Sequence, residues 1–189
     1  MIEKTNFERT IKNQIFNYFL PIVAIGTVAD VVPLIGENRA LVKQGLDLIN
    51  RNHEGIPSSL KGFLKYLNIK DKLDTFHIGF IIGPRINAGG RIQSPYDSLK
   101  ALLYTGDQQI EHLDKIEAIN TERKKLQEDA LKAAEKLLNH DEHILICASE
   151  DFHEGIVGIV AGRITEKYNK PSLILKIDTE KQMAVGSLR

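Results

Sequence analysis

The sequence is poor in the features that mark several whole classes of protein. A single cysteine, Cys147, excludes an intrachain disulfide framework and a zinc site built from several cysteines. No run reaches the roughly 18 apolar residues that a membrane-spanning helix needs. The first residues, MIEKTNFERTIKNQ, are polar and include acidic side chains, which is not the pattern of a signal peptide. We therefore expect a cytoplasmic protein that has no membrane among its partners.

An excess of charge of one sign is also missing, because 25 basic and 25 acidic residues give a formal net charge of zero. Bulk charge thus does not indicate a strongly basic nucleic-acid binder, although a local basic patch is compatible with it. What is present is the composition of an ordinary globular protein, with 42% apolar and 26% charged residues. The 189 residues suffice for one large domain or two small ones.

The N-terminal half is predicted to hold short helices and one buried strand. Ile22–Ala29 is apolar and rich in β-branched residues, which is typical of a strand buried on both faces. A helix over Asn6–Leu20 precedes it and is expected to end at Pro21. Further elements are expected in this order: helices over 37–52, over 56–68 and from about Asp74 to Ile82, an irregular loop over 83–95, and a helical turn over 98–104.

A long helix is predicted over residues 107–139, which contain neither proline nor glycine. Its apolar stripe is interrupted by NTERKK, which is polar all round, and such a helix typically crosses solvent between two bodies. We interpret it as a connector, and its charged residues ERKK as a solvated helix face. A β-α-β unit follows, with strands over 143–149 and 171–177, a helix over 155–168, and a third strand beginning in QMAVGSLR. Cys147 lies in the first of these strands and is expected to be a buried core residue.

Asp30 is a carboxylate at the end of the apolar segment VAIGTVADVVPL. A buried charge needs a cation, a metal or several donors beside it. A structural role as a helix cap or turn residue is the simpler interpretation. The other interpretation is a metal ligand at a strand end, although one carboxylate does not make a divalent metal site.

Three further segments carry candidate anion-binding residues. GPRINAGGR holds Arg85, Asn87 and Arg91 among glycines that allow close backbone approach, and arginine grips phosphate bidentately; the alternative is a surface turn with solvated arginines. In DFHEGIVGIVAGR, His153 precedes a helix whose N-terminus attracts anions, and it is either a substrate contact or a loop histidine without a role. The helix glycines are interpreted as close helix–sheet packing. In GSLR, Ser187 and Arg189 are two residues apart, so a strand places both on one face, as a phosphate site requires.

In this order the pieces resemble the RecJ-type single-strand-specific exonucleases of the DHH phosphoesterase superfamily, over nearly the whole chain from about Phe16 onward. VAIGTVADVVPL with ENRALVKQGL is similar to the family's fourth metal-site motif and the helix after it. GPRINAGGR is similar to its arginine loop, and FHEGIVGIVAGRI to its C-terminal DHHA1 domain. The family motifs Asp-x-Asp, a further Asp and Asp-His-His are absent, and GSLR stands where the family has Gly-Ser-Gly-Arg. We therefore expect an internal fragment of a longer protein.

The resemblance implies an α/β fold in which the C-terminal part of a DHH domain (1–105) is joined by a connector helix (106–140) to the first β-α-β portion of a DHHA1 domain (141–189). It implies a two-metal site for Mn²⁺ or Mg²⁺ that activates water for phosphodiester hydrolysis. By motif position, Asp30 is implied to be a metal ligand and Arg91 a phosphate contact, with His153 in the same cleft. Ser187 and Arg189 are implied to hold the 5′-terminal phosphate.

The implied activity is degradation of single-stranded DNA from its 5′ end, in DNA repair and recombination, with single-strand-binding protein and a helicase as candidate partners. The chain alone is expected to show little or no nuclease activity, because a single ligand cannot assemble two metals. One alternative is a DHH–DHHA1 phosphodiesterase for short oligonucleotides or cyclic dinucleotides; the Gly-Gly-His motif typical of those relatives is not found. Another is a non-catalytic nucleic-acid-binding relative.

Overall fold

The computed structural model describes residues 9–69 and 71–189, which form two compact units. The first unit holds the described residues up to Asn87 together with Pro95–Glu117. The second unit holds Ala88–Ser94 and Ala118–Arg189. Within the described residues, no helix is both long enough and apolar enough to cross a membrane.

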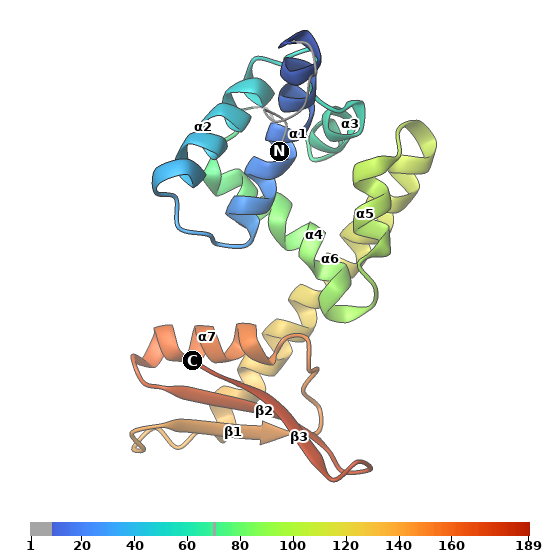
Figure 1. The fold of residues 1–189 in the computed structure, drawn as a ribbon. Coiled ribbons are helices and arrows are strands. Elements are labelled where there is room, and N and C mark those ends of the chain that lie inside the picture. Colours follow the sequence, from blue (N-terminus) through green and yellow to red (C-terminus); the bar gives the residue numbers. More distant parts are fainter. Residues whose placement is uncertain (1–8, 70) are drawn as a thin grey trace. The chain divides into compact units, whose positions relative to one another are not determined.

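The regular elements in the described part of the first unit are all helices, joined by turns and short irregular segments (Figure 1). Its core gathers apolar side chains from several helices, among them the fully buried Phe63, Ile78 and Ile82. The elements, in chain order, are α1 (Arg9–Ala29), α2 (Gly36–Asn50), α3 (Ser58–Tyr66), the π-helix η2 (His77–Ile82), α4 (Gly83–Ile92, whose last turns lie in the second unit), α5 (Tyr96–Leu103) and the first part of α6 (Gly106–Leu137).

The predicted strand Ile22–Ala29 is wrong, because this segment is the second half of the helix α1. Pro21 lies inside that helix and does not end it, and residues 6–8 of the predicted helix fall outside the described residues. Leu20, Ala24 and Ile25 are buried at helical spacing, while Ile22 and Val23 between them are partly exposed. Gly45 of α2 allows this face to pack closely, since a Cβ at Gly45 would lie 2.6 Å from the Cβ of Ala24.

The predicted loop over 83–95 is also wrong in its first part, where η2 continues directly into α4. Pro84 has no N–H group and therefore cannot donate the hydrogen bond to residue 80 that an α-helix requires. The preceding turn is wound as a π-helix, a form that is common next to functional sites. The glycine-rich sequence stays helical here because its apolar members are buried, with Ile82 and Ala88 fully shielded from solvent.

The expected long helix is present as α6, but its middle is not polar all round. Ile119, Asn120, Arg123 and Gln127 are buried, so the interpretation of ERKK as a solvated face is wrong for Arg123. Asn120, Arg123 and Gln127 recur every three or four positions, which places them on one face of the helix. The C-terminal part of α6 then contributes Ala130, Ala134 and Leu138 to the core of the second unit.

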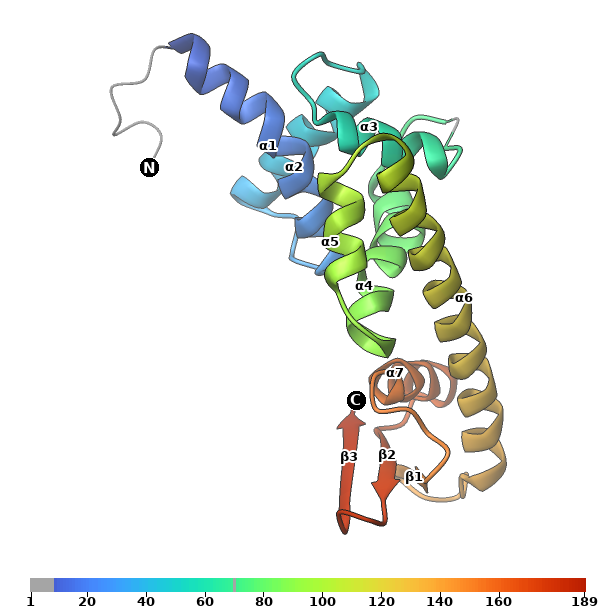
Figure 2. The same ribbon diagram turned by 90° about the vertical axis from the view of Figure 1, so that its right-hand side faces the viewer.

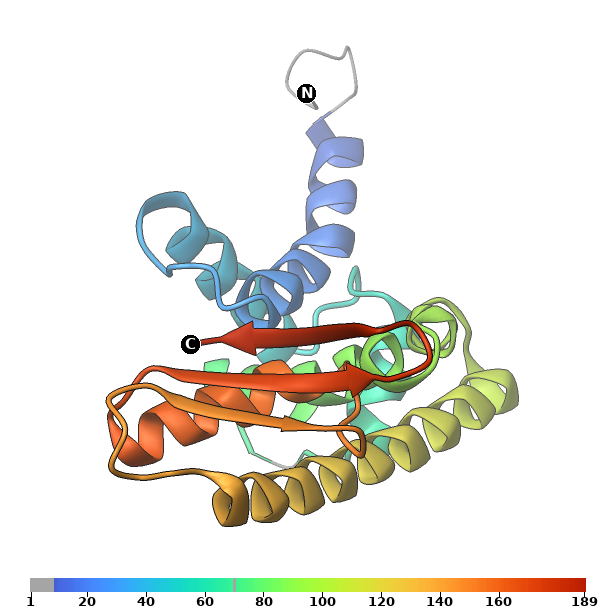
Figure 3. The ribbon, with the colours of Figure 1, turned by 90° about the horizontal axis from the view of Figure 1, so that it is seen from below.

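The second unit contains the predicted β-α-β unit and the third strand. β1 (Leu145–Ser149) pairs in parallel with β2 (Ser172–Asp178), which pairs antiparallel with β3 (Met183–Leu188). The helix α7 (Val157–Tyr168) connects β1 to β2 and lies along the sheet (Figures 2 and 3).

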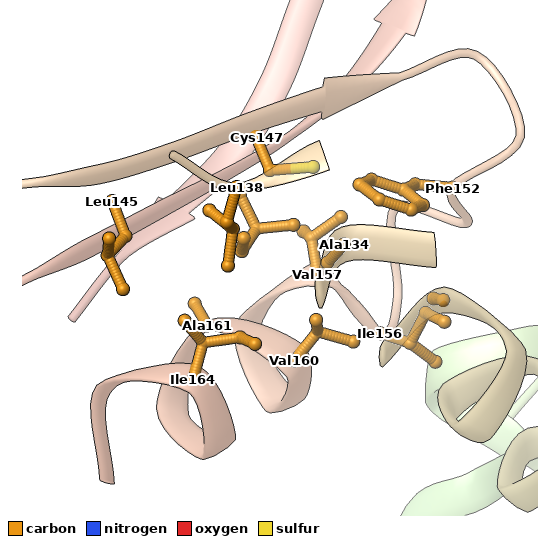
Figure 4. Close-up of a cluster of buried hydrophobic side chains, with 12 residues drawn as sticks. Ala134, Leu138, Leu145, Cys147, Phe152, Ile156, Val157, Val160, Ala161 and Ile164 are labelled. Carbon is orange, nitrogen blue, oxygen red and sulfur yellow. The ribbon is translucent and has the colours of Figure 1, made fainter. Parts of the chain in front are cut away.

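One face of this sheet is covered by α7 and by the end of α6. The close-up in Figure 4 shows Cys147 and Phe152 beside the side chains of α7. Cys147 is buried, as predicted, and its burial raises the pKa of the thiol. The other face is more open, because Ile146 and Leu188 remain more than half exposed. The α/β class expected from the sequence is therefore confirmed by the second unit, although the first unit has no strand among its described residues.

Candidate functional site

Three segments that are distant in sequence meet in the second unit: the end of α4, the turn before α7, and β3. A Cβ at Gly155 would overlap the backbone oxygen of Arg91, so the turn before α7 lies directly against the end of α4. A Cβ at Gly158, in the first turn of α7, would lie 3.5 Å from Oγ of Ser187 in β3. The absence of a side chain thus lets the turn at Gly155 approach the Arg91 backbone and lets α7 at Gly158 approach the Ser187 side chain.

His153 is held in the turn before α7 by its own neighbours. The N–H of Gly155 donates to Nδ1 of His153 at 3.1 Å, and the N–H of Ile156 donates to the His153 carbonyl at 3.1 Å. Because Nδ1 accepts a hydrogen bond, the neutral imidazole carries its proton on Nε2. The half-buried ring therefore keeps one N–H donor for a ligand.

The same turn occurs a second time in the chain, at His53. The tetrapeptide HEGI is repeated there, and the N–H of Gly55 donates to Nδ1 of His53 at 3.0 Å. The turn at His153 is thus a local consequence of the sequence and is not by itself a sign of function. What distinguishes it is the contact of Gly155 with the Arg91 backbone, which the repeat alone does not predict.

Ser187 lies near the end of β3 and faces α7, and Arg189 comes directly after that strand. Ser187 lies opposite the buried Ile174 in the β2–β3 register, and directly paired residues project to the same face. The backbone of Arg189 exchanges two hydrogen bonds with Ser172, at 2.9 and 3.0 Å, and Thr165 of α7 donates to its carbonyl at 3.3 Å. The backbone of Arg189 is thereby fixed while its side chain is exposed.

Arg85 and Asn87 lie in the first unit, whereas Arg91 lies in the second. Arg85 forms a two-pronged ion pair with Glu117, with Nε–Oε2 at 2.6 Å and Nη2–Oε1 at 3.1 Å, and Nη1 donates to the Ile81 carbonyl at 2.8 Å. Its guanidinium is therefore already engaged by a carboxylate. Asn87 is half-buried in α4.

Asp30 lies directly after α1 and is exposed, so it is not the buried carboxylate that the apolar segment suggested. Its backbone N–H donates to the Gly26 carbonyl at 3.0 Å, and the next residue, Val31, has a left-handed φ of 56° that ends the helix. In the described part of the chain, no three His, Cys, Asp or Glu side chains gather as a metal site. One exposed carboxylate does not fit a two-metal centre, so the described residues do not build such a centre by themselves.

The sequence prediction did not identify a polar network in the middle of α6. Arg123 donates to Oδ1 of Asn120 at 3.0 and 3.3 Å and to Oε1 of Gln127 at 3.0 Å. Desolvation by burial, together with the positive charges of Arg91 and Arg163, lowers the pKa of the Arg123 guanidinium. A usable signal was the spacing of Asn120, Arg123 and Gln127, which continues the apolar stripe of the helix with polar residues.

The chain was compared with protein families, with curated proteins and with solved structures, and no family model matches it. It is 33% identical over 175 residues to the single-stranded-DNA-specific exonuclease RecJ of Bacillus subtilis, which covers 90% of this chain and 22% of that protein. It is 34% identical over 161 residues to RecJ of Escherichia coli, covering 80% of this chain and 28% of that protein. The chain thus spans about a quarter of the length of the curated relatives it matches.

Solved RecJ structures are similar to the fold described above. An exonuclease RecJ bound to manganese matches with a TM-score of 0.71 and 27% identity, over 90% of this chain and 42% of that one. RecJ of Thermus thermophilus in complex with Mn²⁺ matches with a TM-score of 0.74 and 28% identity, over 85% of this chain and 24% of that one. The same protein in complex with Mg²⁺ gives a TM-score of 0.72. The resemblance drawn from the sequence is thereby confirmed, and the chain is a segment of RecJ type.

Proposed function

We propose that this chain binds the 5′ end of single-stranded DNA within a longer RecJ-type exonuclease, which hydrolyses phosphodiesters from 5′ to 3′ in DNA repair and recombination. The observation that carries the proposal is that the turn of His153 contacts the Arg91 backbone while the first turn of the following helix α7 contacts Ser187. The RecJ relatives, which are named as exonucleases specific for single-stranded DNA, supply the substrate class. Single-strand-binding protein and a helicase are proposed as partners of the whole protein.

In this proposal the chain's own residues bind and orient a phosphate group. The Arg91 and Arg189 guanidiniums supply positive charge and forked donors, which match the geometry of phosphate oxygens. The Ser187 hydroxyl and Nε2–H of His153 add donors, and the strand pairing of β3 and the turn before α7 hold the two residues in place before the ligand arrives.

Hydrolysis is assigned to the whole protein. We propose Mn²⁺ or Mg²⁺ as its cofactor, in line with the metal-bound RecJ structures, with Asp30 as the ligand contributed by this chain. Such ions activate water for attack on a phosphodiester. Arg85 and Asn87 are proposed as weaker nucleic-acid contacts. The ion pair of Arg85 with Glu117 must break before the Arg85 guanidinium can bind a phosphate.

The test is a titration of the chain into single-stranded oligonucleotides labelled at the 3′ end, in EDTA, followed by fluorescence anisotropy. Each oligonucleotide is prepared with a 5′-phosphate and with a 5′-hydroxyl. We expect tighter binding of the 5′-phosphate form, and loss of this preference in Arg91→Ala and Arg189→Ala. Arg39→Ala removes an exposed arginine of the first unit and serves as the matched control.

Equal affinity for the two 5′ ends contradicts end recognition by this chain, and so does a lack of binding by a protein whose circular dichroism is that of a folded chain. Loss of binding in Arg39→Ala equal to that in Arg91→Ala indicates non-specific charge attraction. A second pair of variants, His153→Ala and His53→Ala, separates the two HEGI turns, and only the first is expected to weaken binding.

A further inference from the structure

The middle of α6 buries a charged side chain that no motif of the sequence accounts for. Asn120 is 0% exposed, Gln127 5% and Arg123 9%. The three residues lie one turn apart on the same face of α6, and all belong to the second unit. Burying polar side chains in this way costs free energy unless they form hydrogen bonds or ion pairs.

The partners that Arg123 finds do not neutralise it. Its Nε, Nη1 and Nη2 atoms donate to the amide oxygens of Asn120 and Gln127, and both of these side chains are uncharged. Among the described residues, no carboxylate forms an ion pair with Arg123. Buried arginines are ordinarily paired with an acid, so the positive charge of Arg123 is held in place but is not compensated.

Two further arginines add to this charge. The positive charges of Arg91 and Arg163 lower the pKa of the Arg123 guanidinium, in addition to the larger effect of desolvation. Neither of the two forms an ion pair within the described residues, and both are exposed. Three like charges placed together in this way repel one another in the absence of an anion.

The cluster also has hydrogen-bond donors to spare. A guanidinium has five N–H donors, and three of those of Arg123 donate to the amide oxygens of Asn120 and Gln127. Two N–H groups therefore remain for a ligand. Nδ2 of Asn120 is buried and has no hydrogen-bond partner in the described part of the protein. An unsatisfied buried donor beside an uncompensated cation fits an anion with several acceptor oxygens, which is the chemistry of a phosphate.

We propose that Asn120 and Arg123, together with Arg91 and Arg163, form a binding site for a backbone phosphate of a single-stranded nucleic acid. The inference rests on the proposed function for the class of ligand and extends the binding surface onto α6. Asn120 and Gln127 act as positioning residues that fix the fork of Arg123 without neutralising it. The phosphate then satisfies Nδ2 of Asn120 and relieves the repulsion among the three arginines.

The first test measures thermal unfolding of the whole chain with and without inorganic phosphate, which needs no nucleic acid and no metal. Phosphate is expected to stabilise the natural chain and Lys124→Gln, a control that removes an exposed charge from the adjacent position of α6. Arg123→Gln is expected to lower phosphate affinity about tenfold or more, because hydrogen bonds to a charged group are lost. Without phosphate, Arg123→Gln loses three hydrogen bonds but also the repulsion among the arginines, so the deciding readout is the response to phosphate and not the melting temperature alone.

The opposite pattern overturns the inference. If Arg123→Gln responds to phosphate as the natural chain does, the network has only a structural role. Asn120→Asp provides a second variant, in which the side chain keeps nearly the same volume. The substitution places a carboxylate beside Arg123 and thereby neutralises its charge. We expect this variant to remain folded and to lose phosphate binding, and retention of full phosphate affinity contradicts the site.

Oligonucleotides distinguish the source of the phosphate and separate this inference from the proposed function. An equal loss of affinity for 5′-phosphate and 5′-hydroxyl strands in Arg123→Gln supports an internal phosphodiester at the site. A loss of affinity confined to strands with a 5′-phosphate indicates that the site binds the terminal phosphate and contradicts an internal phosphodiester there. Binding of inorganic phosphate that depends on Arg123, without binding of either strand, supports the anion site and contradicts the proposed function.

Discussion

Gly155 lies against the backbone carbonyl of Arg91, and no room is left between them for a side chain at position 155. The substitution Gly155→Ala is therefore expected to push the turn before α7 away from the end of α4. Overpacking of this kind typically costs about 1–3 kcal/mol of unfolding free energy. Urea unfolding followed by circular dichroism measures the loss.

Gly162 provides the matched control, because a Cβ at this position of α7 meets no atom within 4 Å. Gly162→Ala is expected to leave stability unchanged or to raise it by up to about 1 kcal/mol, the difference in helix propensity between glycine and alanine. A Gly155→Ala variant as stable as Gly162→Ala contradicts the close backbone contact.

Arg85→Gln is expected to destabilise the first unit by about 2 kcal/mol, because three hydrogen bonds that involve a charged group are lost and Glu117 is left without its forked partner. Arg85→Lys keeps the charge but not the fork, so we expect an intermediate loss. The control is Lys115→Gln, which removes an exposed pair with Glu111 and is expected to cause no measurable change. Equal urea midpoints for Arg85→Gln and Lys115→Gln contradict a structural role of Arg85.

Tyr66 is expected to ionise later than ordinary tyrosines. Burial, followed by the hydrogen bond from its hydroxyl to Asp114 at 2.7 Å and nearby negative charge, raises the pKa of Tyr66 to about 12. The raised pKa means that the folded state favours the neutral phenol. Its contribution to stability is complete below the unfolded pKa of about 10 and is lost as pH rises from there to about 12.

Tyrosinate absorbance against pH tests this expectation. The titration of the natural chain should contain a late component that Tyr66→Phe lacks. Stability should also fall less steeply between about pH 10 and 12 in Tyr66→Phe than in the natural chain. A titration curve that keeps its late component in Tyr66→Phe assigns the shift to another residue.

Cys147 is expected to react slowly with thiol reagents in the folded protein. It is 3% exposed in the core of the second unit, and its burial raises the pKa of the thiol, so little of the reactive thiolate is present. The reaction of the thiol with a chromogenic disulfide reagent, followed by absorbance, should be slow in the native chain and rapid in urea. It should report one thiol per chain. A native rate equal to the unfolded rate indicates that the strand β1 is not held in the core.

The second unit was more predictable from sequence than the first because its apolar runs and helical period indicate a β-α-β unit without a competing assignment. In β1 and β2 the short apolar runs are bounded by polar turns, and α7 between them has a helical period. Ile22–Ala29 is equally apolar, and its β-branched residues favoured a strand. The segment is helical because Leu20, Ala24 and Ile25 pack against α2, a tertiary contact that propensity does not include.

The candidate site was predictable where its chemistry is local and not where it depends on burial. The turn at His153 follows from four consecutive residues, whereas the shared face of Ser187 and Arg189 stays a prediction from strand alternation. The ion pair of Arg85 with Glu117 joins residues 32 positions apart, and nothing near Arg85 indicates it. The burial of Arg123 was missed because charged residues in a helix are ordinarily solvated.

The second unit is made from two separate stretches of sequence, and this governs how the protein can be divided. The chain passes from one unit to the other between residues 87 and 88, 94 and 95, and 117 and 118. Ile92, from the shorter stretch, packs against the core around Ala134 and Ile164. A peptide that begins at Ala118 therefore lacks both that side chain and the Arg91 carbonyl at Gly155, so no single cleavage of the backbone releases this unit whole.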